Sequence, residues 1–244
     1  MKMNYLKVWL GKGRLLLLVL SVTSLSACED TNCIKGDGAI ETRILNLEPF
    51  SRIEANGNFK VYLTQGPNQR VEVKGEPNIL SQLETNVSNS TWKITHRECV
   101  RKSDDVEVYI TIPEVESLFL NGSGHIEGQN TITATDLPVA VNGSGKIALD
   151  VLANKIITQL TGSGKIVLQG ESPVHTVNIS GSGRTEAFNL SSENVKVNIS
   201  GSGTGEVTAI NALDVTISGS GNLYYKGNPT ITQHISGSGK VLKR

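Results

Sequence analysis

Three glutamates occupy the same place in a recurring sequence pattern. Glu127, Glu186 and Glu206 each lie three residues past a Gly-Ser-Gly tripeptide. Two carboxylates at a suitable separation can hydrolyse a glycosidic bond, one as the acid and the other as base or nucleophile. Side-chain alternation places all three on an outer surface, where solvated acids are the simpler interpretation. A carbohydrate-active enzyme, of the glycoside hydrolase or lyase type, therefore stands as one hypothesis.

Three cations share another position in the same pattern. Lys146, Lys165 and Arg184 each follow a Gly-Ser-Gly tripeptide directly. They predict a short basic stripe that could contact an anion or a polysaccharide, and solubility is the alternative role. A phosphate loop is excluded, because the Walker pattern needs four residues between its glycines and a Ser or Thr after the Lys. Here Ile follows both lysines.

The histidines do not form a metal-binding motif. His96, His125, His175 and His234 fall in four separate regions without the spacing of metal ligands. Glycine-rich calcium solenoids carry an Asp after Gly-Gly-x-Gly-x, and no Asp follows the tripeptides here in that way. We therefore expect no metal and no cofactor.

The first 27 residues have the order of an export signal. Four basic residues precede the apolar run 15–20, which is too short to span a bilayer comfortably. The following Leu25-Ser26-Ala27-Cys28 resembles the bacterial lipobox, which implies that Cys28 is acylated and becomes the first mature residue. An ordinary signal peptide with an incidental cysteine is the alternative. Acyl chains contribute about 0.8 kcal/mol for each buried methylene, so two or three would hold the protein on a membrane.

Two further cysteines, Cys33 and Cys99, remain in the mature chain. Outside the cytoplasm such a pair favours a disulfide, and two free thiols are the other interpretation. A metal site is less favoured, since only His96 lies close to either cysteine in the sequence.

Seven Gly-Ser-Gly tripeptides recur at an almost constant interval. They begin at Gly122, Gly143, Gly162, Gly181, Gly201, Gly219 and Gly237, with spacings of 21, 19, 19, 20, 18 and 18 residues. An aliphatic residue stands two places before each tripeptide, and Asn, Thr or Ser stands directly before it. The flanking segments alternate, as in Val195-Lys196-Val197-Asn198-Ile199, which indicates strands with one inward face. Each repeat therefore predicts a strand, a glycine corner, a second strand and a looser corner.

Two topologies fit such repeats, namely an antiparallel meander of hairpins and a parallel solenoid. Only the solenoid stacks each position on its own copy about 4.8 Å away, which explains the recurring polar columns. We therefore predict an all-β, right-handed parallel β-solenoid of seven or more coils. The expected organisation is a signal peptide (1–27), a tether (28–45), an irregular N-terminal part of the solenoid (46–112) and the repetitive solenoid (113–244). In the irregular part, Tyr62, Trp92, His96 and Tyr109 mark where a discrete pocket would lie.

Composition narrows the classes of partner. After the signal is removed, 19 basic and 23 acidic residues remain, a mildly acidic balance that does not favour nucleic acid. Aromatic residues are scarce at 5%, and 25 glycines accompany few prolines, as is typical of a chain rich in strands and tight turns.

Several segments together are similar to a known family. The stretch from Asn56 to Gly66, the stretch Val108–Pro113, the Gly-Ser-Gly series and the stretch Tyr224–Pro229 resemble the "putative autotransporter adhesin, head GIN domain" family, over residues 46–244. That family often has Gly-Ala-Gly where this chain has Gly-Ser-Gly. The resemblance implies an exported β-helical domain, commonly a lipoprotein of Bacteroidetes, and brings no catalytic residues to carry over.

The sequence thus predicts a non-catalytic lipoprotein of the cell envelope, adhesin-like or structural. Its repeated side chains suit weak multivalent contacts better than the convergence of unlike groups that catalysis requires. We expect it to be held at the outer membrane through its lipid, on the periplasmic or the outer surface, with a glycan or protein as its partner.

Overall fold

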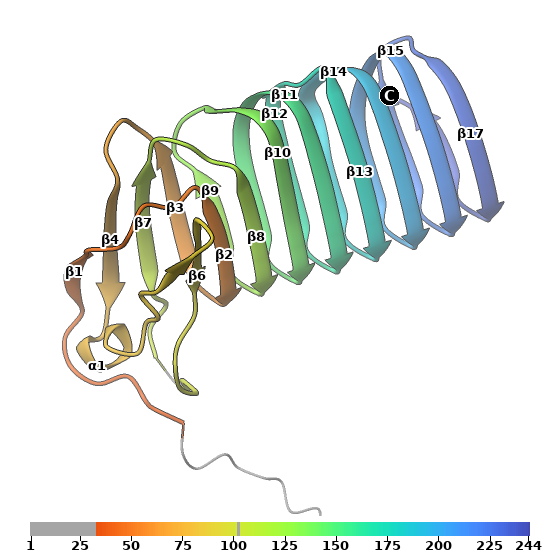
Figure 1. The fold of residues 1–244 in the computed structure, drawn as a ribbon. Coiled ribbons are helices and arrows are strands. Elements are labelled where there is room, and N and C mark those ends of the chain that lie inside the picture. The colour runs from red at the N-terminus through yellow and green to blue at the C-terminus, as the bar shows by residue number, and fades with distance from the viewer. Residues whose placement is uncertain (1–32, 102) are drawn as a thin grey trace, which may run out of the picture. The chain divides into compact units, whose positions relative to one another are not determined.

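The computed structural model describes residues 33–101 and 103–244. These residues form eighteen strands and one short helix (Figure 1). The elements are β1 (Glu41–Leu45), β2 (Arg52–Gly57), β3 (Lys60–Gln65), β4 (Arg70–Gly75), α1 (Pro77–Leu80), β5 (Val87–Ser88), β6 (Thr91–Ile94), β7 (Glu107–Ile112), β8 (Ser117–Gly122), β9 (His125–Gly128), β10 (Ile132–Gly143), β11 (Lys146–Gly162), β12 (Lys165–Glu171), β13 (Val174–Gly181), β14 (Arg184–Gly201), β15 (Thr204–Gly219), β16 (Asn222–Lys226), β17 (Thr230–Gly237) and β18 (Lys240–Lys243).

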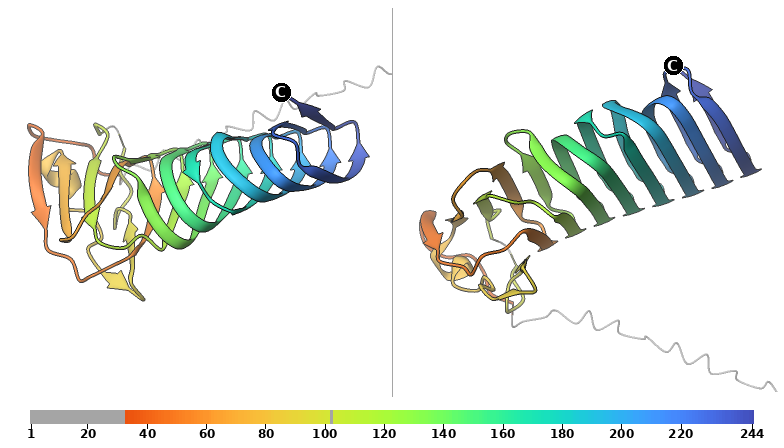
Figure 2. Two further views of the ribbon diagram at one scale, coloured as in Figure 1. Left: turned by 90° about the horizontal axis from the view of Figure 1, so that it is seen from above. Right: turned by 45° about the horizontal axis from the view of Figure 1, so that its top comes forward.

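The repeats stack as parallel coils, which confirms the predicted solenoid and excludes the meander. Strand β13 pairs in parallel with β14 from Val174 opposite Asn194 to Gly181 opposite Gly201. The same residue-on-equivalent-residue register continues into β15 and β17. Figure 2 shows the coils following one another along a single axis. We call the segments that lead into the Gly-Ser-Gly corners the pre-corner face, and the segments that leave them the post-corner face.

Glycine is required at the corners by both conformation and space. Gly181 has φ +115°, a region that L side chains rarely adopt. A Cβ added there would lie 2.6 Å from the carbonyl oxygen of Gly162, the corner of the preceding coil. Glycine therefore recurs at these corners because consecutive coils approach each other too closely there for a side chain.

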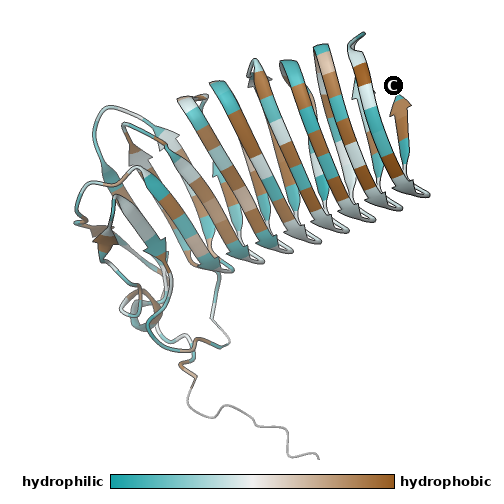
Figure 3. Ribbon diagram, turned by 45° about the vertical axis from the view of Figure 1, so that its right-hand side comes forward, coloured by the Kyte–Doolittle hydropathy of each residue, from teal (hydrophilic) through white to brown (hydrophobic). Residues whose placement is uncertain are grey.

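The core is a column of aliphatic side chains between the two faces. Ile199 is only 2% exposed and lies between Ile179 and Ile217, which are also buried. Figure 3 shows the resulting alternation of hydrophobic and hydrophilic bands along the strands. The alternation predicted from the sequence is confirmed, and on the other side of the corner Thr185 and Gly205 take buried places among the aliphatic residues.

The N-terminal end is built out of sequence order. Strands β2 and β3, joined at Gly57, pair with β8 and β9, so Gly57 stacks on Gly122 as a corner of the solenoid. Between these two coils the chain leaves the stack. It returns as β6 and β7, which pair in parallel with the opposite edges of β2 and β3. Strand β4 then adds antiparallel to β7, and β1 adds antiparallel to β4.

The folded body includes part of the segment predicted as a tether, residues 28–45. Strand β1 lies inside that range and pairs with β4 over its whole length, from Glu41 opposite Gly75 to Leu45 opposite Val71. Leu45 is partly buried against the core. The edge of β4 offers backbone partners to the preceding segment, and this pairing cannot be recognised in the local sequence.

The disulfide and the helix belong to the same end. Cys33 and Cys99 form a disulfide, and the backbone of Ile34 bridges to Val100 beside it. Helix α1 begins with Pro77, whose ring suits the first turn of a helix, and it buries Ile79 and Leu80. These contacts cover the end of the stack that is opposite β17 and β18 (Figure 1).

Candidate functional site

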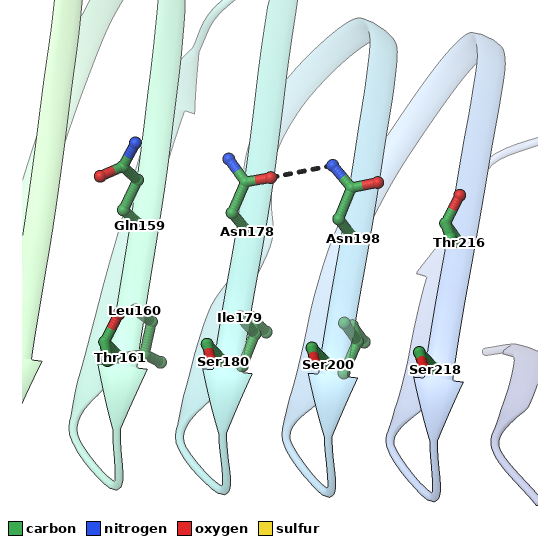
Figure 4. Close-up of a pocket in the computed structure, with 11 residues that line it drawn as sticks. Gln159, Leu160, Thr161, Asn178, Ile179, Ser180, Asn198, Ser200, Thr216 and Ser218 are labelled. Carbon is green, nitrogen blue, oxygen red and sulfur yellow. Dashed lines mark hydrogen bonds between the residues drawn. The ribbon is translucent and has the colours of Figure 1, made fainter. Parts of the chain in front are cut away.

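A shallow trough crosses four coils of the pre-corner face. It is a hollow of about 330 Å³ lined by two outward rows of side chains and the aliphatic residues between them. We call it the hydroxyl trough, formed by Gln159, Asn178, Asn198 and Thr216 in one row and Thr161, Ser180, Ser200 and Ser218 in the other (Figure 4). At about 4.8 Å per coil, it spans ~14 Å from its first coil to its fourth.

The trough follows directly from alternation and side-chain size. Its two rows stand three residues and one residue before each corner, so both point away from the core on the same strands. The second row is small, which leaves a furrow beside the larger amides. The amides are held in place, since Asn198 Nδ2 donates to Asn178 Oδ1 at 2.8 Å. No charged side chain lines the trough.

An aromatic side chain lies on the same face. Phe119 is 36% exposed and occupies the column that continues through Ala140 to Gln159 and the trough. Rows of neutral donors and acceptors with an exposed ring nearby can bind a polar, uncharged polymer. Such a face offers hydrogen bonds for hydroxyl groups and apolar surface for the C–H faces of sugars.

The row that stands one residue before the corners continues beyond the trough, toward the N-terminal coils, as a hydrogen-bonded ladder. Asn142 Nδ2 donates to Asn121 Oδ1, and Asn121 Nδ2 donates to Asn56 Oδ1, each at 2.8 Å. The polar ladder expected from the stacking of repeats therefore exists at these coils, where its groups stabilise the stack.

The predicted basic stripe is aligned but largely neutralised. The register places Lys146, Lys165 and Arg184 opposite one another on the post-corner face. Lys165 Nζ lies 2.7 Å from a carboxylate oxygen of Glu186, and Arg184 lies 3.1 Å from Glu206. Two of the three cations therefore face carboxylates on the next coil, and the stripe does not present continuous positive charge.

The same contacts describe the three candidate glutamates. Glu186 and Glu206 are adjacent in the stack, and Glu127 lies 3.3 Å from His125 in its own coil. Each acid has a basic neighbour on an open sheet face. They form neither a cleft nor an arrangement in which one carboxyl would act as the acid and the other as the base. Their geometry suits charge pairing along the stack.

The irregular N-terminal part contributes core and a cross-strand pair. Trp92 is fully buried and its Nε1 donates to the carbonyl oxygen of Glu84. His96 packs against Phe59 in a tilted arrangement with ring centroids 4.8 Å apart, and burial lowers the pKa of His96.

Tyr62 and Tyr109 stack on each other at 4.9 Å on the outer surface. The Tyr109 hydroxyl donates to Glu107, which raises the pKa of Tyr109 to about 12. Because each ring covers a face of the other, the pair does not form an open aromatic platform.

Other predicted features have different positions. His175 is buried in the core, while His125 and His234 lie on outer columns. Within the described residues, no group of three or more His, Cys, Asp or Glu side chains could hold a metal ion. Cys28, the predicted lipid site, lies outside the part of the chain that the structure describes.

Sequence reasoning missed the hydroxyl trough. The signal was present in the residues three and one places before each corner, which are polar and uncharged from Gln159 to Ser218. Their common orientation follows from the strand period of two, but the furrow depends on how the coils stack.

The fold and the trough define a class: a parallel β-solenoid with short coils, glycine corners and a neutral polar face. The family model described as "Putative auto-transporter adhesin, head GIN domain" matches residues 49–229, and the chain belongs to this family. The family resemblance noted in the sequence is thereby confirmed. None of the curated proteins compared with the chain matches it.

Solved structures from Bacteroidetes share the fold. A putative adhesin from Bacteroides fragilis superposes with a TM-score of 0.82 at 24% identity, covering 86% of this chain and 100% of that one. A putative adhesin from Parabacteroides distasonis gives 0.74 at 22% identity, over 87% and 100%. A putative lipid binding protein from the same species gives 0.71 at 24% identity, over 86% and 99%. At these identities the likeness shows the fold alone.

Proposed function

We propose that the protein is a non-catalytic, lipid-anchored protein of the outer membrane that binds neutral glycan strands along the hydroxyl trough. The observation that carries the proposal is the trough itself, with two rows of uncharged amides and hydroxyls in register over four coils. A repeating ligand can meet the same groups at each coil. Several weak contacts then add to one useful affinity.

The geometry also favours binding over turnover. Catalysis needs unlike groups that converge on one reacting atom. The trough repeats like groups, and the acids of the post-corner face are paired with cations. Membership of an adhesin-like family also supports binding over turnover.

The anchor would set the orientation of the trough. Cys28 is five residues before Cys33, which the disulfide holds at the capped end of the solenoid. A lipid at Cys28 would therefore attach the molecule by that end. Eight stacked corners, from Gly57 to Gly237, extend ~34 Å away from it at ~4.8 Å per coil.

Glycan binding is tested by filling the trough. Ser180→Arg with Ser200→Arg places two long side chains in the small row, so binding of the full chain to neutral glycans on an array should fall at least about ten-fold, equivalent to about 1.4 kcal/mol. The matched control is Thr176→Arg with Asn194→Arg, on the same strands β13 and β14 but outside the trough. Equal binding by both variants, or product release from a glycan, would contradict the proposal.

The anchor is tested separately. Cys28→Ser removes the thiol that would be acylated, so the chain should leave the detergent phase of a phase-partition assay and retain its signal peptide. Metabolic labelling with a fatty acid gives a second readout. Labelling of the variant equal to that of the wild type would show that the lipid is attached elsewhere and would contradict the assignment of Cys28.

A further inference from the structure

Charge is distributed unevenly along the solenoid axis. Residues 113–214 carry ten acidic and five basic residues. Residues 215–244 carry Lys226, Lys240, Lys243 and Arg244 and no acidic side chain. All four cations are exposed, and no ion pair among the described residues includes them. We call these four residues the basic end.

The cations of the post-corner face change their partners along the stack. In the middle coils they face carboxylates, as in Lys165 with Glu186 and Arg184 with Glu206. At the basic end they lie over aromatic rings. Lys226 Nζ is 4.6 Å from the centre of the Phe188 ring, and the Arg244 guanidinium is 4.6 Å from that of Tyr224. A ring positions a cation without neutralising it, so the charge stays available to a ligand.

Two of these cations are also neighbours in the stack. Thr208 lies opposite Lys226, and Tyr225 lies opposite Lys243. Continuing this register by one residue places Arg244 opposite Lys226. The backbone agrees, because the Arg244 N–H donates to the Tyr225 carbonyl oxygen at 2.9 Å. Like charges opposite each other in a sheet destabilise it. A bound anion would relieve this repulsion.

We propose that the basic end is a binding site for an acidic polysaccharide, one that carries carboxylate or sulfate groups. Lys240 begins β18 and Arg244 follows its last residue, while Lys226 ends β16 on the neighbouring coil, so the cations belong to two adjacent coils. Tyr224 lies opposite Leu242 on β18, and its ring holds the Arg244 guanidinium in place. The site lies apart from the neutral hydroxyl trough and does not depend on it.

A polysaccharide fits this surface better than a membrane does. Peripheral insertion into a bilayer requires a continuous apolar face beside the cations. Within β18, Leu242 is the exposed large apolar side chain, and Lys240 and Lys243 lie on either side of it in the sequence. The basic end also lies at the opposite end of the stack from β1 (Figure 1), and hence from the segment that follows the proposed anchor.

The experiment measures binding of the full chain in detergent to immobilised heparin, polygalacturonate and dextran. Wild-type protein should bind the two acidic polymers more tightly than dextran, the neutral reference for the trough, and this excess should fall as salt rises, because exposed charges are screened. Lys240→Glu with Arg244→Glu should weaken this binding at least about ten-fold. The control, Lys35→Glu with Lys155→Glu, changes net charge equally at lysines outside the basic end and should bind like the wild type.

The outcomes separate the alternatives. Equal weakening by the two charge-reversed variants would show that total charge, and not this site, determines binding, and would overturn the proposal. So would capture by vesicles containing phosphatidylglycerol without binding to either acidic polymer. If the Glu variant fails to fold by circular dichroism, Lys240→Gln with Arg244→Gln takes its place. Loss of binding to acidic polymers with intact trough binding would support this site independently of the proposed function.

Discussion

At the scale of single residues, one polar pair interrupts the aliphatic core. His175 lies inside the solenoid, in the column where neighbouring coils have Ile156 and Val195. Its Nε2 lies 2.9 Å from the hydroxyl oxygen of Thr158, which is also fully buried. The hydrogen bond pairs both groups, and the apolar setting disfavours a charged imidazole. Burial accordingly lowers the pKa of His175 from 6.5 to about 4.

This pair predicts a loss of stability in acid. The pKa of His175 is lower in the folded chain than in the unfolded chain, so its contribution is complete above about pH 6.5. The stability that neutral His175 contributes declines as the pH falls from about 6.5 to about 4, and it is lost below about pH 4. A shift of this size corresponds to about 3 kcal/mol at most. The free energy of unfolding, measured by denaturant titration between pH 7 and pH 4, should fall accordingly.

The matched variant replaces both partners with the residue type of neighbouring coils. Thr158→Val with His175→Val removes both members of the pair together, so neither is left buried without its partner, and Val177 and Val195 occupy the equivalent places in neighbouring coils. His96, whose pKa is also lowered by burial, is unchanged in both proteins. The double variant should therefore lose less stability between pH 7 and pH 4 than the wild type. Identical pH profiles of the two proteins would show that His175 does not cause the loss of stability in acid.

At the scale of elements, the corner determines how closely two coils can stack. Gly181→Ala should destabilise the fold by about 2 kcal/mol or more, because the backbone there has φ +115° and the new Cβ would meet the Gly162 carbonyl. Ser182→Ala, in the same corner, removes a hydroxyl with no side-chain hydrogen bond among the described contacts and should be nearly neutral. Thermal melts of the two variants provide the comparison, and equal melting temperatures would contradict this account.

The disulfide acts on the N-terminal end alone. It closes a loop of 66 residues that contains β1 to β6, and constraining the unfolded chain in this way contributes about 2–4 kcal/mol. Cys33→Ser with Cys99→Ser should therefore increase hydrogen exchange in β1, α1 and β6. The coils from β10 to β15 should stay protected, because each depends on its neighbours in the stack. Uniform loss of protection along the chain would indicate that the capped end stabilises the whole solenoid.

At the scale of the whole molecule, the stack should tolerate removal of one complete coil. Deleting residues 182–201 joins Gly181 to Ser202 and keeps the corner sequence and the inward side of every strand. The protein should remain folded with a lower melting temperature, as nearest-neighbour stacking predicts. Deleting residues 182–191 removes half a coil and should abolish folding, because the remaining strands lose their register. Circular dichroism distinguishes the two outcomes.

The two faces of the solenoid lead to different partners. The hydroxyl trough is neutral and crosses the middle coils, whereas the basic end gathers cations on the last two. No helix in the described residues is long and apolar enough to cross a membrane.

Local pattern was sufficient to predict the repeating part of the fold. Strand alternation assigns Ile199 to the inside and Ser200 to the outside, and a glycine corner every 18–21 residues requires coils of equal length. Stacking of equivalent residues then follows, because identical units bury their apolar faces best in register. The parallel solenoid and the family were both accessible in this way.

The remainder depended on contacts between segments that are distant in the sequence. The pairing of β6 and β7 with β2 and β3, and of β1 with β4, joins strands that have no repeat signature. The same holds for the site, since the spacing of Lys165 and Glu186 does not reveal that they neutralise each other across coils. Tertiary structure decided which outward polar side chains pair with each other and which stay open to a ligand, because that depends on the partner each side chain meets one coil away.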